Sequence, residues 1–213
     1  METSSKEMLR PGGACQERLR SGGRSALAEV FMGHRDRLRR MVQLRMDRRV
    51  ARRVDPSDVL QEAFLDAERQ LDDYLAEPLL SPFIWLRCLT GQRLMAIHRR
   101  HLGAAKRDAK HEVSLDQPLM PQADSQLLSN RLAGRITSPS LAAIRAEMNA
   151  RLHALVDDMD PLDREILALR HYEELGNQEA AEELGILPAA ASKRYIRALE
   201  RLKANLARAG LTE

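Results

Sequence analysis

A cluster of positively charged and small polar side chains lies in a short stretch near the C-terminus of the chain. Lys193, Arg194 and Arg197 follow Ser192 at spacings that a helix would bring together. Lysine and arginine side chains bind nucleic-acid phosphates, and in the major groove they bind the edges of guanine bases. The stretch therefore predicts DNA binding, although an ordinary helix with a solvated basic face would contain the same residues.

Two helices and a turn must position these side chains. Ala180, Ala181 and Leu184 have the spacing of a helix buried on one side, and Gly185 supplies the positive φ needed just past its end. Pro188 suits the first turn of a second helix, because the N–H that proline lacks would have no helical partner there. The inward face of that helix is predicted to contain Ala191, Tyr195, Ala198, Leu202 and Leu206. This pattern predicts a helix-turn-helix whose basic second helix enters the major groove.

A helix of opposite charge is predicted after Val54. Asp55 can cap it, Pro56 fits its first position, and Asp58 places a negative charge near the positive end of the helix dipole. Its outward face carries Asp58, Gln61, Glu62, Asp66 and Glu68. Such a face suits a protein partner with a basic groove, and charge balance with the preceding basic helix is the alternative.

That preceding segment, 25–53, combines an apolar stripe with a dense set of arginines. The stripe consists of Leu27, Val30, Phe31, Leu38, Met41, Val42 and Met46. The arginines are Arg35, Arg37, Arg39, Arg40, Arg45, Arg48, Arg49, Arg52 and Arg53. A solvated helix face and a surface near a polyanion both fit this pattern.

A further basic helix is predicted from Phe83 to His101. The groups that it offers to a nucleic acid are Trp85, Arg87, Gln92, Arg93, His98, Arg99, Arg100 and His101. Planar and cationic side chains together suit single-stranded nucleic acid, but we interpret Trp85, the only tryptophan, as a core residue. No third ligand accompanies His98 and His101, so the sequence predicts no metal site.

The composition of the 213-residue chain favours helices, because aromatic residues make up only 3% of it. We expect an all-α fold with helical domains at 25–102 and 141–213, the second a helix-turn-helix domain. A proline-containing stretch at 103–140 is predicted to be a flexible linker, and the glycine-containing stretch at 1–24 a flexible leader.

Nothing in the sequence indicates secretion, membrane insertion or a cofactor. The apolar stretch from Leu79 to Leu89 is too short to span a membrane, and the N-terminus lacks the apolar core of a signal peptide. Cys15 and Cys88 form neither a C-x-x-C pair nor a zinc-ligand spacing. We expect an intracellular protein whose net charge of +3 is divided into basic and acidic blocks.

Three segments in this order resemble the sigma-70 family of RNA polymerase initiation factors, in its small, two-domain extracytoplasmic-function form. They are DPSDVLQEAFLDA at 55–67, FIWLRCLTGQRLMAIHRRH at 83–101 and LDREILALRHYEELGNQEAAEELGILPAAASKRYIRALERLK at 162–203. The resemblance implies a bacterial, cytoplasmic protein without catalysis of its own. The partners that it implies are core RNA polymerase and promoter DNA, and an anti-sigma factor is a further partner that the family allows.

The resemblance also implies roles for individual residues. The residues assigned to core-polymerase binding are Asp55, Asp58, Gln61 and Glu62. The residues assigned to recognition and melting of the downstream (−10) promoter element are Gln92, Arg93, His98, Arg99 and Arg100. The residues assigned to the upstream (−35) element are Ala189, Ala190, Ser192, Lys193, Arg194 and Arg197.

The chain departs from the family pattern at two places. Many relatives carry Asn and Asp where this chain has Gln92 and Ala96. Leu187 replaces a common Ser or Thr cap, so we expect the start of the second helix to be weaker by about 1 kcal/mol. The run Ala189–Ala191 offers few hydrogen bonds to bases, which predicts readout through DNA shape, backbone contacts and thymine methyl groups.

Two other function classes are alternatives to a promoter-specificity subunit. A stand-alone helix-turn-helix regulator is the alternative function, but it leaves the acidic helix at Asp55 and the basic helix at Phe83 without a role. An enzyme is not indicated, because the sequence shows no nucleophile–base pair, no phosphate-binding loop and no H-E-x-x-H motif.

Overall fold

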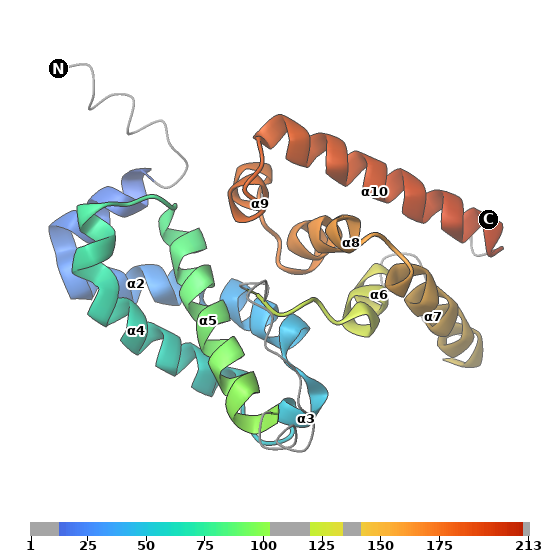
Figure 1. Ribbon diagram of the computed structural model, residues 1–213, viewed down its shortest axis with the longest axis horizontal. Coiled ribbons are helices and arrows are strands. Elements are labelled where there is room, and N and C mark those ends of the chain that lie inside the picture. The colour runs from blue at the N-terminus through green and yellow to red at the C-terminus, as the bar shows by residue number, and fades with distance from the viewer. Residues whose placement is uncertain (1–12, 103–119, 134–141, 211–213) are drawn as a thin grey trace, which may run out of the picture. The chain divides into compact units, whose positions relative to one another are not determined.

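The computed structural model describes residues 13–102, 120–133 and 142–210, which fall into two helical units (Figure 1). The first unit comprises Met1–Pro121 and the second Gln122–Glu213. The described residues contain helices and no strand, so the predicted all-α fold of two helical parts is confirmed.

Three long helices build the first unit: α2 (Gly13–Arg45), α4 (Pro56–Ala76) and α5 (Pro82–Leu102). They pack against one another in pairs, and the short α3 (Arg48–Ala51) packs against α5 (Figure 1). The apolar stripe predicted for α2 is buried in this packing, which follows from the burial of nonpolar surface as the main driving force of folding.

Aromatic pairs connect the helices of the first unit. Phe31 of α2 and Phe64 of α4 meet edge to face with ring centroids 5.2 Å apart. Trp85 of α5 stacks on Tyr74 of α4 with centroids 4.1 Å apart, and only 8% of Trp85 is exposed. The interpretation of Trp85 as a core residue is confirmed.

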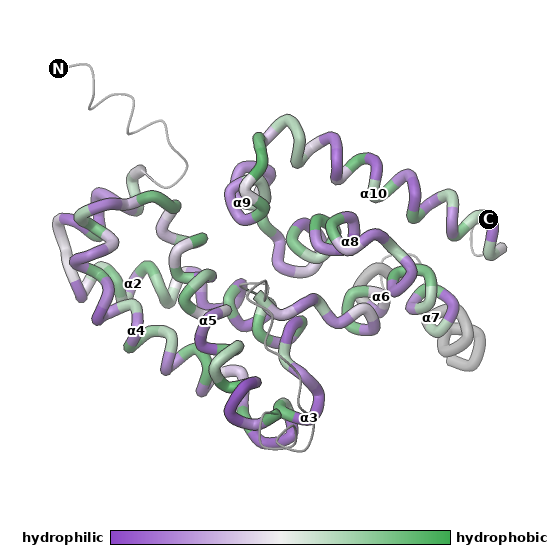
Figure 2. The backbone as a smooth tube through the Cα atoms, in the orientation of Figure 1, coloured by the Kyte–Doolittle hydropathy of each residue, from purple (hydrophilic) through white to green (hydrophobic). Residues whose placement is uncertain are grey.

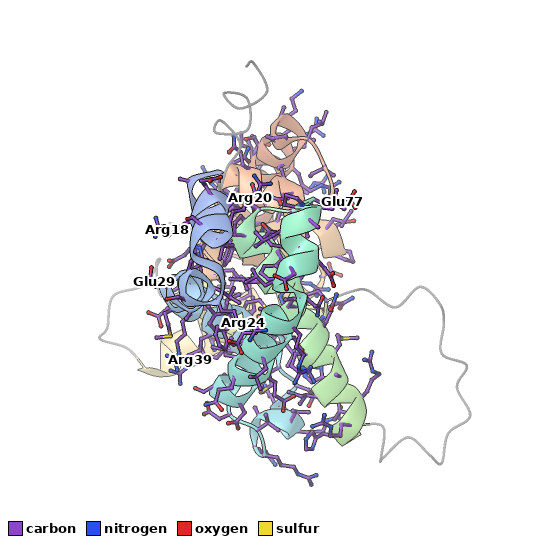
Figure 3. All side chains as sticks on the ribbon, turned by 90° about the vertical axis from the view of Figure 1, so that its left-hand side faces the viewer. Arg18, Arg20, Arg24, Glu29, Arg39 and Glu77 are labelled. Atoms are coloured by element: carbon purple, nitrogen blue, oxygen red, sulfur yellow. The ribbon has the colours of Figure 1, made fainter. Side chains whose placement is uncertain are left out.

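α2 begins earlier than the sequence predicts. Residues 13–24, which fall in the predicted leader, are helical, and a kink interrupts the helix at Gly23 (φ 53°, ψ −133°). That conformation suits glycine, which has no Cβ to clash, and the fully buried Leu19 anchors the segment. Exposed Arg18, Arg20 and Arg24 lie along it (Figure 3). The glycines therefore mark a bend and not the end of the helix, and residues 1–12 lie outside the described part.

The second unit contains α6 (Ser125–Ala133), α7 (Ala142–Asp157), α8 (Pro161–Leu167), α9 (Asn177–Glu183) and α10 (Pro188–Arg208). A π-helical turn, η1 (Ala168–Tyr172), continues directly from α8. α10 packs on α7, α8 and α9, and α6 packs on α7 and η1. Figure 2 shows hydrophobic and hydrophilic positions alternating along α10, which has one buried and one exposed face.

α6 lies within the stretch that the sequence predicts as linker. Asp124 accepts hydrogen bonds from the backbone N–H groups of Gln126 and Leu127, at 2.8 and 3.1 Å, and so caps the helix start. Leu128 is fully buried, which ties the helix to the second unit. The prolines and polar residues of 103–140 gave no signal of this cap or of the burial of Leu128. Residues 103–119 and 134–141 lie outside the described part.

Candidate nucleic-acid interface and charged helix faces

The turn between α9 and α10 is fixed by a glycine and by an asparagine. Gly185 has φ 62°, the left-handed conformation that the sequence predicts there. The Asn177 side-chain amide donates to the Pro188 carbonyl at 2.9 Å, and the Ser192 hydroxyl donates to Asn177 Oδ1 at 3.1 Å. The Ser192 hydroxyl, one of the predicted DNA-binding groups, is therefore used to hold the helix-turn-helix together.

α10 begins without a side-chain cap. Leu187 occupies the N-cap position, makes no side-chain hydrogen bond and is 76% exposed, while Pro188 takes the first helical position. The prediction of an uncapped helix at Leu187 is confirmed. α8 differs, because Asp160 accepts hydrogen bonds from the backbone N–H groups of Leu162 and Asp163 at 3.0 and 3.2 Å.

An exposed row of residues, here called the outward stripe, follows α10 from its first turn. It consists of Ala189, Ala190, Lys193, Ile196 and Arg197. Four of these are predicted upstream-element residues. Ile196 was not predicted, although its distance of three residues from Lys193 and seven from Ala189 places it on the same face of a helix. The outward stripe is the surface that α10 can offer to a major groove.

Arg194, also predicted to contact DNA, points to a neighbouring helix instead. It forms an ion pair of 3.3 Å with Asp163 of α8, and Arg201 pairs with the same carboxylate. We call Asp163, Arg194 and Arg201 the Asp163 cluster. The side chain of Asp163 is only 4% exposed, so it needs these partners in place of water. In the structure Arg194 therefore positions α10, and its predicted DNA contact requires this ion pair to open.

Tyr195 connects α10 to η1. Its hydroxyl lies 3.1 Å from His171 Nε2, and the guanidinium of Arg170 lies 5.3 Å from the centre of its ring. Arg170 also donates to the backbone carbonyl of Leu175, in the segment that leads to α9. The π-helical turn thus holds the inward side of α10 with polar contacts as well as apolar ones.

The acidic helix α4 has the predicted start. Asp55 accepts from the Ser57 N–H at 2.7 Å, and Asp58 accepts from the Asp55 N–H at 3.2 Å, which completes a capping box. The hydrogen bonds from Ser57 lower the pKa of Asp55, so its carboxylate is charged at neutral pH. Asp55, Asp58 and Gln61 are exposed and form a polar row along α4.

An apolar groove of about 520 Å³ lies beside this row, between α2 and α4. Phe31, Met32, Leu60, Phe64 and Leu65 line it, together with Ala28, Arg35, Ser57 and Gln61. Two of these large hydrophobic residues are exposed: Met32 by 64% and Leu65 by 47% of its surface. No local sequence pattern predicts this groove, because its lining comes from two different helices that packing brings together.

Arg93 of α5 lies against the acidic helix. Its Nε donates to Asp66 Oδ2 at 2.9 Å, its second guanidinium nitrogen pairs with the same carboxylate, and its third lies 3.2 Å from Glu62 Oε2. We call Arg93, Asp66 and Glu62 the Asp66 cluster. It joins one predicted downstream-element residue to one predicted polymerase-binding residue, so the two side chains are partners within the unit. The charge-balance alternative therefore holds for these two side chains.

His98 also has a partner inside the first unit. Its Nε2 accepts a hydrogen bond of 3.1 Å from the backbone N–H of Asp47, the N-cap of α3. Burial lowers the pKa of His98, and the charge of Asp47 opposes that shift only in part. His98, predicted as a DNA contact, is therefore a neutral acceptor in the structure and fixes the start of α3. Gln92, Arg99 and Arg100 are the members of the predicted set that are exposed.

Two arginines of the predicted basic surfaces are buried. Arg87 of α5 has no exposed surface, and Arg45, at the end of α2, donates a hydrogen bond of 2.8 Å to the carbonyl of Pro121. Neither guanidinium can contact a polyanion from these positions. The sequence could not separate them from the exposed arginines, because both lie in runs of mixed apolar and charged residues.

Metal and cysteine chemistry have little support in the described part of the chain. Within residues 13–102, 120–133 and 142–210, no three His, Cys, Asp or Glu side chains come together as a metal-binding group. Cys15 and Cys88 form no disulfide. Burial raises the pKa of the Cys15 thiol, and the charge of Arg18 opposes this by a smaller amount. Because the pKa is raised, less of the reactive thiolate is present at neutral pH. No described helix has the length and apolar character needed to cross a membrane.

Comparisons with known proteins add two findings. Residues 149–202 match the family model described as sigma-70, region 4. The fold is similar to that in the structure of CnrH in complex with the cytosolic domain of CnrY, with a TM-score of 0.50 and 20% sequence identity. That likeness covers 92% of this chain and 96% of the other. No curated protein matches the sequence.

Proposed function

We propose that the chain, whose residues 149–202 match sigma-70 region 4, is a sigma factor of the extracytoplasmic-function form that directs core RNA polymerase to promoters and assists their melting. As a sigma factor it is an initiation factor and not an enzyme. We assign residues 25–102 to a region 2-like domain for core polymerase and the downstream element. Residues 141–213 are assigned to a region 4-like domain for the upstream element.

One observation carries the proposal: the chain presents an outward cationic stripe on a helix-turn-helix and, on a separate helix, an acidic row beside an apolar groove. DNA repels carboxylates, so the acidic row suits a protein partner. A stand-alone DNA-binding regulator needs only the first surface. A subunit that brings a polymerase to DNA needs both.

Core-polymerase binding is assigned to Asp55, Asp58 and Gln61, extended by Leu65 at the edge of the groove. All four are exposed on one side of α4. A partner helix with basic and apolar side chains could bury Leu65 while its charges approach the two carboxylates, a combination of apolar core and polar rim that is common in protein interfaces. Glu62 is left out of this set because it is paired with Arg93.

DNA contact in the second unit is assigned to Lys193 and Arg197, and in the first unit to Gln92, Arg99 and Arg100. Their side chains are exposed and lie on helices whose other faces are buried. Each cation that neutralises a phosphate releases bound counterions, so binding must weaken as salt is added. Arg99 and Arg100 lie in the last turn of α5, where cations also complement the helix dipole.

Run-off transcription with purified bacterial core polymerase on a promoter library tests the function. We expect initiation at a defined promoter sequence when the chain is added to core polymerase. Binding to DNA without binding to polymerase would instead support the stand-alone regulator, and binding to neither would reject both.

Matched variants test the two surfaces. The double variant Gln61→Ala with Leu65→Ala should weaken core-polymerase binding. The control is Gln70→Ala with Leu79→Ala, which also removes one exposed amide and one exposed leucine and should leave binding unchanged. For DNA, Lys193→Ala and Arg197→Ala should each reduce the slope of log affinity against log salt by about 1. Arg208→Ala, about 16 Å further along α10, should leave the slope unchanged.

A regulatory partner is a further part of the proposal. The similar CnrH structure contains the cytosolic domain of CnrY, and we extend this to an anti-sigma factor that occupies the acidic row and groove of α4. Such a protein would compete with core polymerase for Leu65. Its addition should then abolish run-off transcription, and the Gln61→Ala, Leu65→Ala variant should bind it less tightly.

A further inference from the structure

Ile196 is an exposed β-branched residue in the middle of the outward stripe. It is 53% exposed, whereas Ala191, Ala198 and Leu202 on the opposite side of α10 are buried. It lies between Lys193, one turn earlier, and the adjacent Arg197. The exposed half of this aliphatic side chain, between two cations, is available for contact with an apolar group of a ligand.

The neighbouring polar side chains of Ser192 and Arg194 have partners within the protein. The Ser192 hydroxyl donates to Asn177, and the Arg194 guanidinium pairs with Asp163. Lys193 and Arg197 can bind phosphates or guanine edges, and these groups are all polar. Within the outward stripe, the aliphatic surface comes from Ala189, Ala190 and Ile196, and Ile196 is the largest of the three.

The apolar group that the major groove offers is the 5-methyl group of thymine. Apolar side chains contact this methyl group, and both surfaces lose water when they meet. Given the proposed function, we propose that Ile196 is a specificity-determining residue that packs against the methyl group of a thymine in the upstream promoter element. This contact selects thymine over cytosine at one base pair of that element.

Glu200 limits how far the contact surface extends. It is exposed one turn beyond Ile196 on the same side of α10. Its carboxylate would be repelled by phosphates, so α10 leaves the DNA near this residue. Ile196 is therefore the last apolar residue that the outward stripe presents, and we expect its thymine at the end of the element that α10 contacts.

Replacement of thymine by deoxyuridine, which removes only the 5-methyl group, tests the inference. The full chain assembled with core polymerase first selects its promoter from a library. Each thymine of the selected upstream element, on both strands, is then replaced singly, and binding of the holoenzyme is measured by competition. Wild type is expected to lose about fourfold in affinity at one position, the equivalent of one buried methyl-sized group.

Ile196→Ala should bind the thymine duplex about as weakly as wild type binds the deoxyuridine duplex, and should show no further loss on deoxyuridine. Leu162→Ala is the matched control, because Leu162 is equally exposed but lies on α8, and it should retain the fourfold difference. An upstream element without any methyl-dependent thymine would overturn the inference, as would a thymine preference that persists in Ile196→Ala. If no promoter is selected at all, the proposed function itself fails, and the inference fails with it.

Discussion

The two units each contain an arginine–carboxylate cluster that joins neighbouring helices, but the clusters differ in how deeply the carboxylate is buried. In the Asp163 cluster the acceptor side chain is 4% exposed and receives two arginines. In the Asp66 cluster the acceptor is 16% exposed and receives Arg93, with the exposed Arg69 of the same helix as a surface partner at 3.2 Å. If an arginine is removed, water can take its place more easily at the more exposed carboxylate of Asp66 than at Asp163. An arginine–aspartate pair should therefore contribute more to helix positioning in the Asp163 cluster than in the Asp66 cluster.

Loss of the buried carboxylate is expected to have the largest effect. Asp163→Ala removes the acceptor for Arg194 and Arg201, and hydrogen bonds between charged groups contribute more than neutral ones. We expect the free energy of unfolding of the second unit to fall by about 2–3 kcal/mol. The partly exposed arginines can regain water, so the loss should stay below that of a fully buried pair.

Urea denaturation followed by two probes measures this effect. Trp85 is the only tryptophan and lies in the first unit, so its fluorescence reports that unit, while far-UV circular dichroism reports all helices. Asp163→Ala should shift the dichroism transition and leave the Trp85 transition in place. A shift of the Trp85 transition by the same amount would contradict the assignment of the cluster to the second unit.

The Asp66 cluster is expected to give a smaller effect. Arg93→Ala should lower the free energy of unfolding of the first unit by about 1–2 kcal/mol, because Asp66 and Glu62 retain access to water. The measurement is the urea midpoint from Trp85 fluorescence. Arg99→Ala, an exposed arginine on the same helix, is the control and should stay within about 0.5 kcal/mol of wild type. Equal destabilisation by both variants would show that Arg93 is merely a surface residue.

The helices also differ in whether a side chain caps their first turn. α4 and α8 begin with an aspartate cap, and α10 begins with Leu187. Leu187→Ser supplies an acceptor for the first-turn amides and should raise the stability of the second unit by about 1 kcal/mol. The exposed leucine contributes little packing that could be lost. Leu187→Ala has no acceptor, so a gain of equal size in that variant would rule out capping as the cause.

The smallest expected effect concerns pH. Burial lowers the folded-state pKa of His98 below the ordinary value of 6.5, so the unfolded chain binds the proton more readily. Its contribution to stability is complete above pH 6.5 and is lost as the pH falls from there through the folded pKa. The pKa of Asp47, lowered to about 2 chiefly by its hydrogen bond with Arg49, affects only a more acidic range.

His98→Gln tests this pH dependence, because the glutamine carbonyl can still accept from the Asp47 N–H but does not titrate. Urea midpoints of the Trp85 transition at pH 7.5 and 5.5 should differ less in the variant than in wild type. An unchanged difference would assign the pH dependence to other groups.

Local sequence signals predicted the helix starts and the turn of the helix-turn-helix correctly. Asp55 with Pro56, Asp160 with Pro161, and Gly185 act within a few residues of themselves, so their effect does not depend on the rest of the fold. The apolar stripes were predictable for a similar reason, because the helical repeat alone decides which side chains share a face. Exposure of Lys193 and Arg197 followed from the same rule.

The kink at Gly23 and the helix α6 were not predictable from such signals. Glycine can end a helix or bend it. Here the helix continues on the N-terminal side of Gly23, where Leu19 is buried, so the glycine bends the helix. α6 depends on one capping aspartate and on the burial of Leu128, within a stretch whose prolines and polar residues suggest a linker.

By itself the sequence determined the starts of α4, α8 and α10, the apolar stripes of α2, α4 and α10, and that the second helix of the helix-turn-helix is basic. Only the tertiary structure decided which charges remain for DNA. Arg93 and Asp66 are 27 residues apart in sequence, and Arg194 and Asp163 are 31 apart. A charge pair forms where packing brings two side chains together and removes water from them, and that proximity depends on the positions of whole helices.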